Sequence, residues 1–419
     1  MKKISLKGLE QNCFYDKLDN GLEVFMFPYE NKKNYFISYA TRFGSDVLEF
    51  KVDGEYYKPP LGIAHFLEHK MFEQEDGIDP FTFFSKSGTD ANASTSFEYT
   101  QYICSGTKNF NENLKYLINY VNSPYFTDSN VLKEKGIIAE EIKMYDDIPD
   151  FKLEMKLRQA VYKNCSRRID IAGSVKEINK ITKDDLYTCY NSFYTPNNMF
   201  ILIVGNFLPE EAIDIINKEL GSKKTLKLPD IKKCDEPLVV NKKNVTLKED
   251  IEIPKLAVGI KVPTKKIKMD DLELDLYTNM LLDIVFGDSS IFRERMRIEK
   301  LLNDFYVENE SIPGFRVFYL MASSLDINKL EEEIKYELSN LSISLKSFER
   351  IKKVWIANEV KMIDNINSTV SNYYDDILKY KKIIPNKIEI IRNMDIEKLN
   401  KLISLIDFNN MSIVKMINK

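Results

Sequence analysis

The sequence predicts an α+β protein of two similar domains, and three observations indicate this class. Segments with the pattern of strands alternate with segments of helical spacing through the first half of the chain. A Lys-rich, weakly patterned stretch at 222–248 follows this half and contains Pro229 and Pro237. The second half then repeats a part of the first. We therefore predict an N-terminal domain at 1–221, a linker at 222–248 and a C-terminal domain at 249–419.

Strands are predicted where β-branched and aromatic residues gather between turn residues. Residues 22–27 alternate around Glu23, a turn at 28–32 follows, and 35–43 is the next such segment. Residues 93–103 are expected to form one further strand. The run 198–205 is almost entirely apolar and is flanked by turn residues, which is typical of a buried strand.

Helices are predicted between these strands from apolar residues that recur every three or four positions. The sequence 59–62, Pro-Pro-Leu-Gly, is a suitable start for a helix that contains two histidines. Further helical segments are expected at 110–122, 128–147, 151–163, 183–193 and 209–220.

The evidence for a repeat consists of two pairs of matching segments that are separated by the same number of residues. Residues 197–201, Asn-Asn-Met-Phe-Ile, recur as 409–413, Asn-Asn-Met-Ser-Ile, about half a chain later. Each run precedes a strand and follows a helix that opens with an acidic cluster, at 183–186 and 395–399. A common offset for two elements indicates duplication, and only the first copy contains histidine.

The only two histidines of the chain, His65 and His69, stand four residues apart. One helical turn separates them, so both imidazoles can point the same way, and Glu68 shares their face. Two nitrogen ligands and a carboxylate on one helical face are what a catalytic zinc site needs. The alternative is a capped surface helix without a metal.

A zinc site of this kind needs a third protein ligand from another element. In the predicted helix 128–147, Glu134 and Glu141 lie seven residues apart on the apolar stripe, whereas Glu140 falls about a quarter turn away. A carboxylate on a buried face is costly unless it is paired or bound to a metal. Glu134 and Glu141 are therefore both candidates, although a lysine partner could also satisfy a boundary glutamate.

Composition excludes several other classes of protein. The formal net charge is −4, which gives no electrostatic support for binding nucleic acid. No apolar stretch reaches the ~18 residues of a membrane span, and the basic N-terminus lacks the apolar core of a signal peptide. The five cysteines are odd in number and widely spaced, which favours reduced thiols. We expect a cytoplasmic protein without nucleic-acid or membrane partners.

The histidine segment resembles the inverted zinc motif (HxxEH) of the pitrilysin/insulinase-type metallopeptidases, the inverzincins. The likeness extends over 62–72 (GIAHFLEHKMF) and over 134–142 (EKGIIAEEI), and it covers the layout of the whole chain. It is closest to short bacterial members that are similar to the processing peptidases. The resemblance implies two domains, each a mainly antiparallel sheet packed with helices, that form half of a clam-like chamber.

The same resemblance implies the roles of residues. His65, His69 and Glu141 would bind one Zn²⁺ per chain, Glu134 would support the site, and Glu68 would be the general base of a metalloendopeptidase. Residues 88–95 resemble the edge strand that pairs with substrate, which gives Asn92, Ala93, Ser94 and Thr95 as contacts of an extended peptide. An ordinary loop that leads into a strand is the alternative for this segment.

The sequence departs from the family in the second domain. An arginine and a tyrosine seven residues apart often bind substrate there, but the nearest counterparts, Arg297 and Tyr306, are nine residues apart. Either a local insertion preserves the geometry or another chain supplies these groups. We therefore expect the catalytic subunit of a heterodimer with a related peptidase-fold subunit, and a homodimer is the alternative.

Two other functions compete with a peptidase that acts on peptides, such as a leader peptide. One is a non-catalytic or structural subunit of a processing-peptidase-like complex, which usually has a degraded motif. The other is a zinc-stabilised binding protein, for which Glu68 would have no use. The intact set of His65, Glu68, His69 and Glu141 favours the enzyme.

Overall fold

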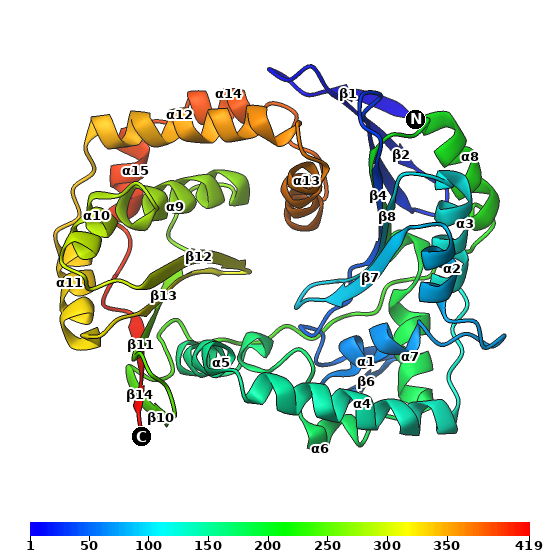
Figure 1. Ribbon diagram of the computed structural model, residues 1–419, viewed down its shortest axis with the longest axis horizontal. Coiled ribbons are helices and arrows are strands. Elements are labelled where there is room, and N and C mark those ends of the chain that lie inside the picture. Colours follow the sequence, from blue (N-terminus) through cyan, green and yellow to red (C-terminus); the bar gives the residue numbers. More distant parts are fainter. The chain divides into compact units, whose positions relative to one another are not determined.

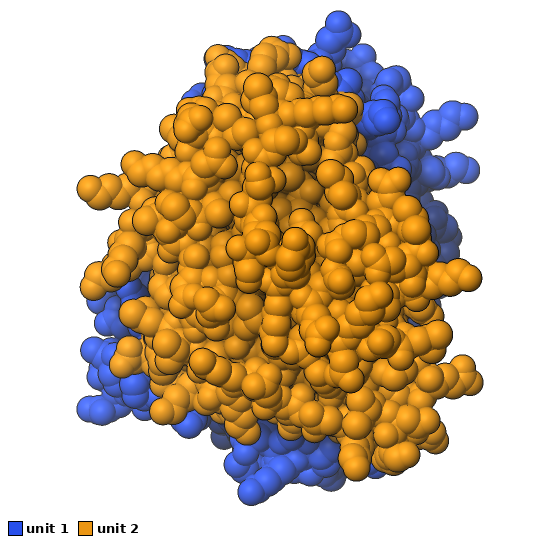
Figure 2. Space-filling view, turned by 90° about the vertical axis from the view of Figure 1, so that its left-hand side faces the viewer, with its two compact units in different colours: residues 1–143, 170–233, 359–387 blue, residues 144–169, 234–358, 388–419 orange.

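The computed structural model describes residues 1–419 and contains two compact units, each assembled from three separate segments of the chain (Figure 2). Unit 1 comprises 1–143, 170–233 and 359–387. Unit 2 comprises 144–169, 234–358 and 388–419. Segments 144–169 and 359–387 thus belong to the unit whose main sequence lies in the other half of the chain. In the predicted linear division into 1–221, 222–248 and 249–419, each of these two segments stays with its own half of the chain.

Unit 1 is built on a seven-stranded sheet with the order β1-β2-β3-β9-β4-β8-β7. Figure 1 labels β1, β2, β4, β8 and β7 of this sheet. Only β3 and β9 run parallel, and β7 lies at one edge. The strands are β1 (Lys2–Ser5), β2 (Asn12–Lys17), β3 (Glu23–Pro28), β4 (Tyr35–Thr41), β7 (Asp90–Thr95), β8 (Thr100–Gly106) and β9 (Met199–Gly205), beside a small hairpin of β5 (Phe50–Val52) and β6 (Glu55–Tyr57).

Unit 2 is built on a five-stranded sheet with the order β10-β14-β11-β13-β12. Only β10 and β14 run parallel. The strands are β10 (Asn244–Glu249), β11 (Lys255–Pro263), β12 (Asp304–Ile312), β13 (Phe315–Ser323) and β14 (Met411–Asn418). The prediction of two α+β halves with mainly antiparallel sheets is confirmed.

The two sheets repeat one topology. Strands β3-β9-β4-β8-β7 of unit 1 correspond to β10-β14-β11-β13-β12 of unit 2, and both sets follow the same sequence order. The single parallel pair falls at the same place in both. β9 and β14 begin at Met199 and Met411, the methionines of the two matching Asn-Asn-Met runs. The topology agrees with an internal duplication.

All helices except α8, which follows β9, lie between corresponding strands of each copy. In the first half they are α1 (Ile63–Lys70), α2 (Pro80–Lys86), α3 (Phe110–Val121), α4 (Asp128–Asp146), α5 (Pro149–Val161), α6 (Val175–Ile178), α7 (Lys183–Phe193) and α8 (Pro209–Leu220), with short 3₁₀ turns at Ser166–Arg168 and Pro196–Asn198. In the second half they are α9 (Asp271–Phe286), α10 (Ile291–Ile298), α11 (Ile327–Ser339), α12 (Leu345–Met362), α13 (Ile366–Tyr380), α14 (Lys387–Arg392) and α15 (Ile396–Ile403). None of them combines the length and the apolar composition that a membrane-spanning segment requires.

Both faces of the unit 1 sheet are covered, which explains the continuous apolar run of β9. Successive side chains of a strand point to opposite faces. Ile201 and Ile203 belong to the core that includes α1, α3 and α7. Phe200 and Leu202 pack on the other face in a cluster with α13, including Tyr373. A strand buried on both faces shows no alternation of polar and apolar residues.

The unit 2 sheet is covered in the same way, with α5 in the place that α13 takes in unit 1. Leu157 and Val161 of α5 pack with Ala257 and Val414 of the sheet. Gly259 of β11 makes this close approach possible, because a Cβ there would lie 2.4 Å from Cγ2 of Val161. The helix and the sheet are in contact along an apolar surface that continues across β11 and β14.

A buried carboxylate of unit 2 lies against α5. Glu310 of β12 accepts hydrogen bonds from Arg158 at 2.7 Å, Arg167 at 3.1 Å, Tyr162 at 2.5 Å and Tyr319 at 2.9 Å. Burial alone would raise the pKa of Glu310, but the charges of the two arginines and the bond from Tyr162 outweigh it and lower the pKa to about 2. This carboxylate has all its partners inside the unit.

One predicted element is wrong. The segment 93–103 forms no single strand but a hairpin of β7 and β8 around 96–99. The hydroxyl of Ser96 accepts hydrogen bonds from the backbone N–H groups of Glu98 and Tyr99, and the Ser96 N–H donates to the carbonyl of Tyr99. A serine that bonds its own following backbone reverses the chain without glycine or proline. The hairpin places β7 at the sheet edge.

Candidate metal centre

Helix α1 begins at a position where only glycine fits. Gly62, the residue before its first turn, has φ +88°, and a Cβ there would lie 2.3 Å from the carbonyl oxygen of Ala172. The left-handed conformation and this close approach both require glycine. Helix α1 then runs to Lys70 with Phe66 and Leu67 buried in the core, so His65 and His69 are held on its other side.

The three predicted ligands come together, two from α1 and one from α4. Figure 1 labels both helices. The two imidazole rings have centroids 4.6 Å apart. Oxygens of Glu141, from α4, lie 3.6 Å from Nε2 of His65 and 3.4 Å from Nε2 of His69. The ligand atoms of the three residues all lie within 4.8 Å of one another.

This donor set fits a zinc ion. Tetrahedral ligands about 2.1 Å from zinc lie roughly 3.4 Å from one another, which is close to the separations found here. Burial and the charge of His69 lower the pKa of His65 to about 3, so His65 is neutral at pH 7, and a neutral imidazole offers one nitrogen lone pair to a metal. Three protein ligands leave one position of a tetrahedron for water.

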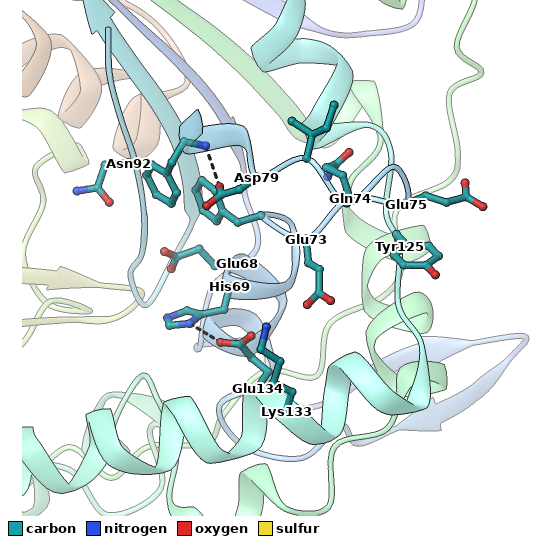
Figure 3. A pocket seen from close by; sticks show the side chains of 14 residues that line it. Glu68, His69, Glu73, Gln74, Glu75, Asp79, Asn92, Tyr125, Lys133 and Glu134 are labelled. Carbon is teal, nitrogen blue, oxygen red and sulfur yellow. Dashed lines mark hydrogen bonds and ion pairs between the residues drawn. The ribbon is translucent and has the colours of Figure 1, made fainter. Parts of the chain in front are cut away.

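Glu134 lies behind His69 and does not join the ligand cluster. Its Oε1 is 3.0 Å from Nδ1 of His69, and Figure 3 shows this bond as a dashed line. The bond directs Nε2 of His69 toward Glu141. Burial opposes the charged forms of both groups, but their mutual bond and charges outweigh it, so the pKa of His69 is raised and that of Glu134 is lowered. Glu140 is exposed and pairs with Lys143, so it lies outside the site.

Glu68 stands beside the ligands with a partner of its own. The hydroxyl of Thr95, at the end of β7, donates a hydrogen bond of 2.6 Å to Oε2 of Glu68. Burial raises the pKa of Glu68, and this bond lowers it by less. A carboxylate with a raised pKa next to a metal site is suited to accept and release a proton.

The predicted substrate contacts lie on β7, the edge strand. Asn92 is exposed and borders the same pocket as Glu68, whereas Ala93 is packed partly against the core. Ser94 accepts a hydrogen bond of 2.9 Å from Gln101 of β8. Thr95 is engaged with Glu68, a role that the strand pattern alone does not indicate.

A pocket of about 700 Å³ opens next to Glu68 and His69 (Figure 3). Phe72 and Phe81 form an apolar wall, with their rings stacked at 4.5 Å. Several acidic groups and one lysine complete the lining, among them Glu73, Glu75, Asp79, Glu134 and Lys133. Such a pocket can accept an apolar or cationic side chain more readily than an acidic one.

Two further points concern residues outside the motif. Sequence reasoning missed Lys70, whose buried ammonium group lies 3.9 Å from Oε2 of Glu134. The signal was a charged residue directly before the apolar pair Met71 and Phe72.

Of the expected pair in unit 2, Arg297 lies exposed on α10, and Tyr306 of β12 is 53% exposed.

Comparison with known proteins agrees with this geometry. Residues 54–173 match the family description Insulinase (Peptidase family M16), and residues 180–354 match Peptidase M16 inactive domain. The uncharacterized zinc protease YmfH of Bacillus subtilis (strain 168) is 42% identical over 295 residues, which are 69% of each chain.

Solved structures show the same fold. An M16-like peptidase structure from Alicyclobacillus acidocaldarius has a TM-score of 0.92 and 30% identity, with 99% of this chain and 100% of that chain covered. The periplasmic protease PqqL from Escherichia coli has a TM-score of 0.78 and 19% identity, and the match covers 97% of this chain but 48% of PqqL. The chain therefore belongs to the M16 peptidase family, the pitrilysin and insulinase family of zinc proteases.

Proposed function

We propose that the protein is a zinc-dependent endopeptidase that cleaves extended peptides. The observation that carries this proposal is the convergence of His65, His69 and Glu141, with Glu68 beside them and free of the ligand cluster. The presence of every group that hydrolysis needs supports an enzyme over a structural subunit. YmfH, the relative that is 42% identical, is named a zinc protease.

His65, His69 and Glu141 would hold the zinc, which when bound lowers the pKa of a water molecule and polarises the peptide carbonyl. Glu68 would take the proton from the attacking water at its carboxylate and pass it to the leaving amine. Thr95 would hold that carboxylate in place. Glu134 would keep His69 in the tautomer whose Nε2 faces the metal.

The substrate would lie along β7 as an added strand. The free edge of β7 offers backbone groups for pairing, and this mode gives affinity with little sequence choice. Asn92 would contact the peptide, and the pocket lined by Phe72 and Phe81 would receive one side chain. A peptide has to be extended to fit, which favours short peptides and unfolded segments, with a leader peptide as one candidate.

A second subunit would complete the enzyme. The match covers 48% of PqqL, so that protein has in one chain about twice the length available here. Two chains of this size would supply as much. We propose a heterodimer with a related peptidase-fold subunit, with a homodimer as the alternative, and a location in the cytoplasm.

The test combines zinc content with cleavage of quenched peptides, with and without a chelator. We expect about one zinc per chain and chelator-sensitive cleavage. Glu68→Gln should keep the zinc and lower kcat about a thousandfold, within the range that general bases contribute. Glu140→Gln, an exposed carboxylate on α4, is the control and should change neither.

Normal turnover in Glu68→Gln would refute the assigned base. Zinc without any cleavage, also in the presence of the co-purified partner, would favour the non-catalytic subunit instead. Absence of bound zinc in the purified wild-type protein and after addition of zinc would refute the metal site.

A further inference from the structure

Lys70, the last residue of α1, is a charged residue in the interior of unit 1. Its side chain is 0% exposed, whereas Lys133, whose charge also acts on Glu134, is exposed. An ammonium group that is withdrawn from water requires anionic partners. The site supplies two, and one of them contacts a metal ligand.

The partners of Lys70 are Glu73 and Glu134. Lys70 donates a hydrogen bond to Glu73, and its Nζ lies 3.9 Å from Oε2 of Glu134. The side chain of Glu73 is 37% exposed, so water can also solvate it. The side chain of Glu134 is only 11% exposed, so it depends more on charges within the protein.

Glu134 thus lies between the buried ammonium group and the ring of His69. Its Oε1 is bonded to Nδ1 of His69 at 3.0 Å, while Oε2 faces Lys70. Three other carboxylates, those of Glu68, Glu73 and Glu141, lie in the same region. Without a fixed positive charge, their repulsion would favour a position of Glu134 away from His69.

We propose that Lys70 is a positioning residue that holds Glu134 against His69 and thereby raises the affinity of the site for zinc. This inference rests on the proposed function and deepens it, since it assigns a role to a residue that contacts neither the ligand atoms nor the pocket. Groups that support a metal-bound histidine typically change metal affinity by about 10- to 100-fold when they are removed.

A purely structural role is the competing explanation, and the chain offers a matched control. Lys261 in unit 2 is also 0% exposed and is paired with Glu236 at 2.6 Å. Lys70→Met and Lys261→Met remove the same charge from equally buried sites. Only Lys70→Met should weaken the binding of zinc.

The experiment measures the zinc Kd by competition with a chelator, together with the absorption spectrum of the Co²⁺-substituted protein. Lys70→Met should raise the zinc Kd about tenfold and alter the Co²⁺ spectrum. Lys70→Arg keeps the charge and should bind zinc more tightly than Lys70→Met, although its larger head group has to fit a fully buried site. Lys261→Met should leave Kd and spectrum unchanged. A wild-type Kd in Lys70→Met, or an equal rise in Lys261→Met, overturns the proposal.

Double substitution tests whether Lys70 acts through Glu134. If it does, Lys70→Met combined with Glu134→Gln should bind zinc as well as Glu134→Gln alone. In Lys70→Met the carboxylate of Glu134 loses a positive partner, which could prevent folding. The double variant lacks this carboxylate, so its zinc Kd can be compared with that of Glu134→Gln even where Lys70→Met alone does not fold. A further loss of affinity in the double variant contradicts the proposal. If the wild type itself binds no zinc, the proposed function fails; if only the Lys70 effect is absent, this inference fails alone.

Discussion

The two units place a pair of helices at the same point of one strand order, yet the pairs differ in chemistry. In unit 1, the eight-residue α1 presents two histidines toward Glu141 of α4. In unit 2, the corresponding α9 is sixteen residues long and mostly buried, and its polar link to α12 is a 2.6 Å bond from Trp355 to Asp283. The two units therefore share the position of the helix pair, and a few side chains decide whether that pair can bind a metal.

A carboxylate from each unit, the buried Glu310 and the partly exposed Glu141, allows the same comparison. Glu310 accepts from two arginines and two tyrosines, so none of its bonding capacity is left for a ligand. Glu141 faces two imidazoles at distances too long for good hydrogen bonds, which leaves its lone pairs available. The partners of a carboxylate therefore indicate better than its burial whether it can bind a ligand.

The largest expected effect comes from exchanging a carboxylate for an amide in both helix pairs. Glu141→Gln removes a ligand and should weaken zinc binding by more than the roughly 100-fold that outer partners contribute. Asp283→Asn keeps an oxygen that can accept from Trp355 and should leave zinc affinity unchanged. Chelator competition measures both. An equal loss of zinc affinity in Asp283→Asn would contradict a metal site that belongs to the helix pair of unit 1 alone.

The second effect concerns stability, at Glu310. Glu310→Gln removes the negative charge that Arg158 and Arg167 share, although Arg158 keeps its 2.9 Å pair with Glu154, and should cost about 3 kcal/mol of unfolding free energy at pH 7, measured by urea unfolding. Glu308→Gln on the same strand is the control. Burial raises the pKa of Glu308, so removal of its charge should cost little. Similar losses in both variants would contradict the special role of Glu310.

The pH dependence of this effect follows from the lowered pKa of Glu310. A carboxylate with a depressed folded-state pKa stabilises the protein above its unfolded-state pKa and loses this contribution as the pH falls. With a folded-state pKa of about 2 against an ordinary value of 4.5, the advantage of the wild type over Glu310→Gln should shrink between about pH 4.5 and 2.

The smallest effect is expected at Thr95, which sharpens the difference between ligand and base. Thr95→Val removes the bond to Glu68 and should lower kcat about tenfold, equivalent to a net hydrogen bond to a charged group, while the zinc Kd stays constant. Thr95→Ser keeps the hydroxyl and should retain most activity. A loss of zinc in Thr95→Val would instead assign Thr95 to the metal site.

Periodicity predicted most of the elements and the repeat, because these depend on local pattern. The continuous apolar run at 198–205 and the helix 128–147 correspond to β9 and α4. The turn at 96–99 was not predicted, because Ser96 forms it through its side chain, without glycine or proline.

The candidate site was predictable in part. Spacing placed Glu134 and Glu141 on one stripe, and only the family resemblance separated the ligand from its supporting residue. Lys70 was missed because its burial depends on the packing of unit 1, and because one of its two partners, Glu134, comes from another helix. The exchange of α5 and α13 was also missed, since amphipathic spacing shows that a helix has an apolar face but not which sheet will cover it.

The place of α13 has a consequence for synthesis. Translation proceeds from the N-terminus, so all seven strands of the first sheet have emerged long before 359–387 are made. Until then Phe25, Phe200 and Leu202 have no helix above them. We expect a nascent chain or a truncated gene product that stops near residue 221 to expose this apolar surface, which favours aggregation.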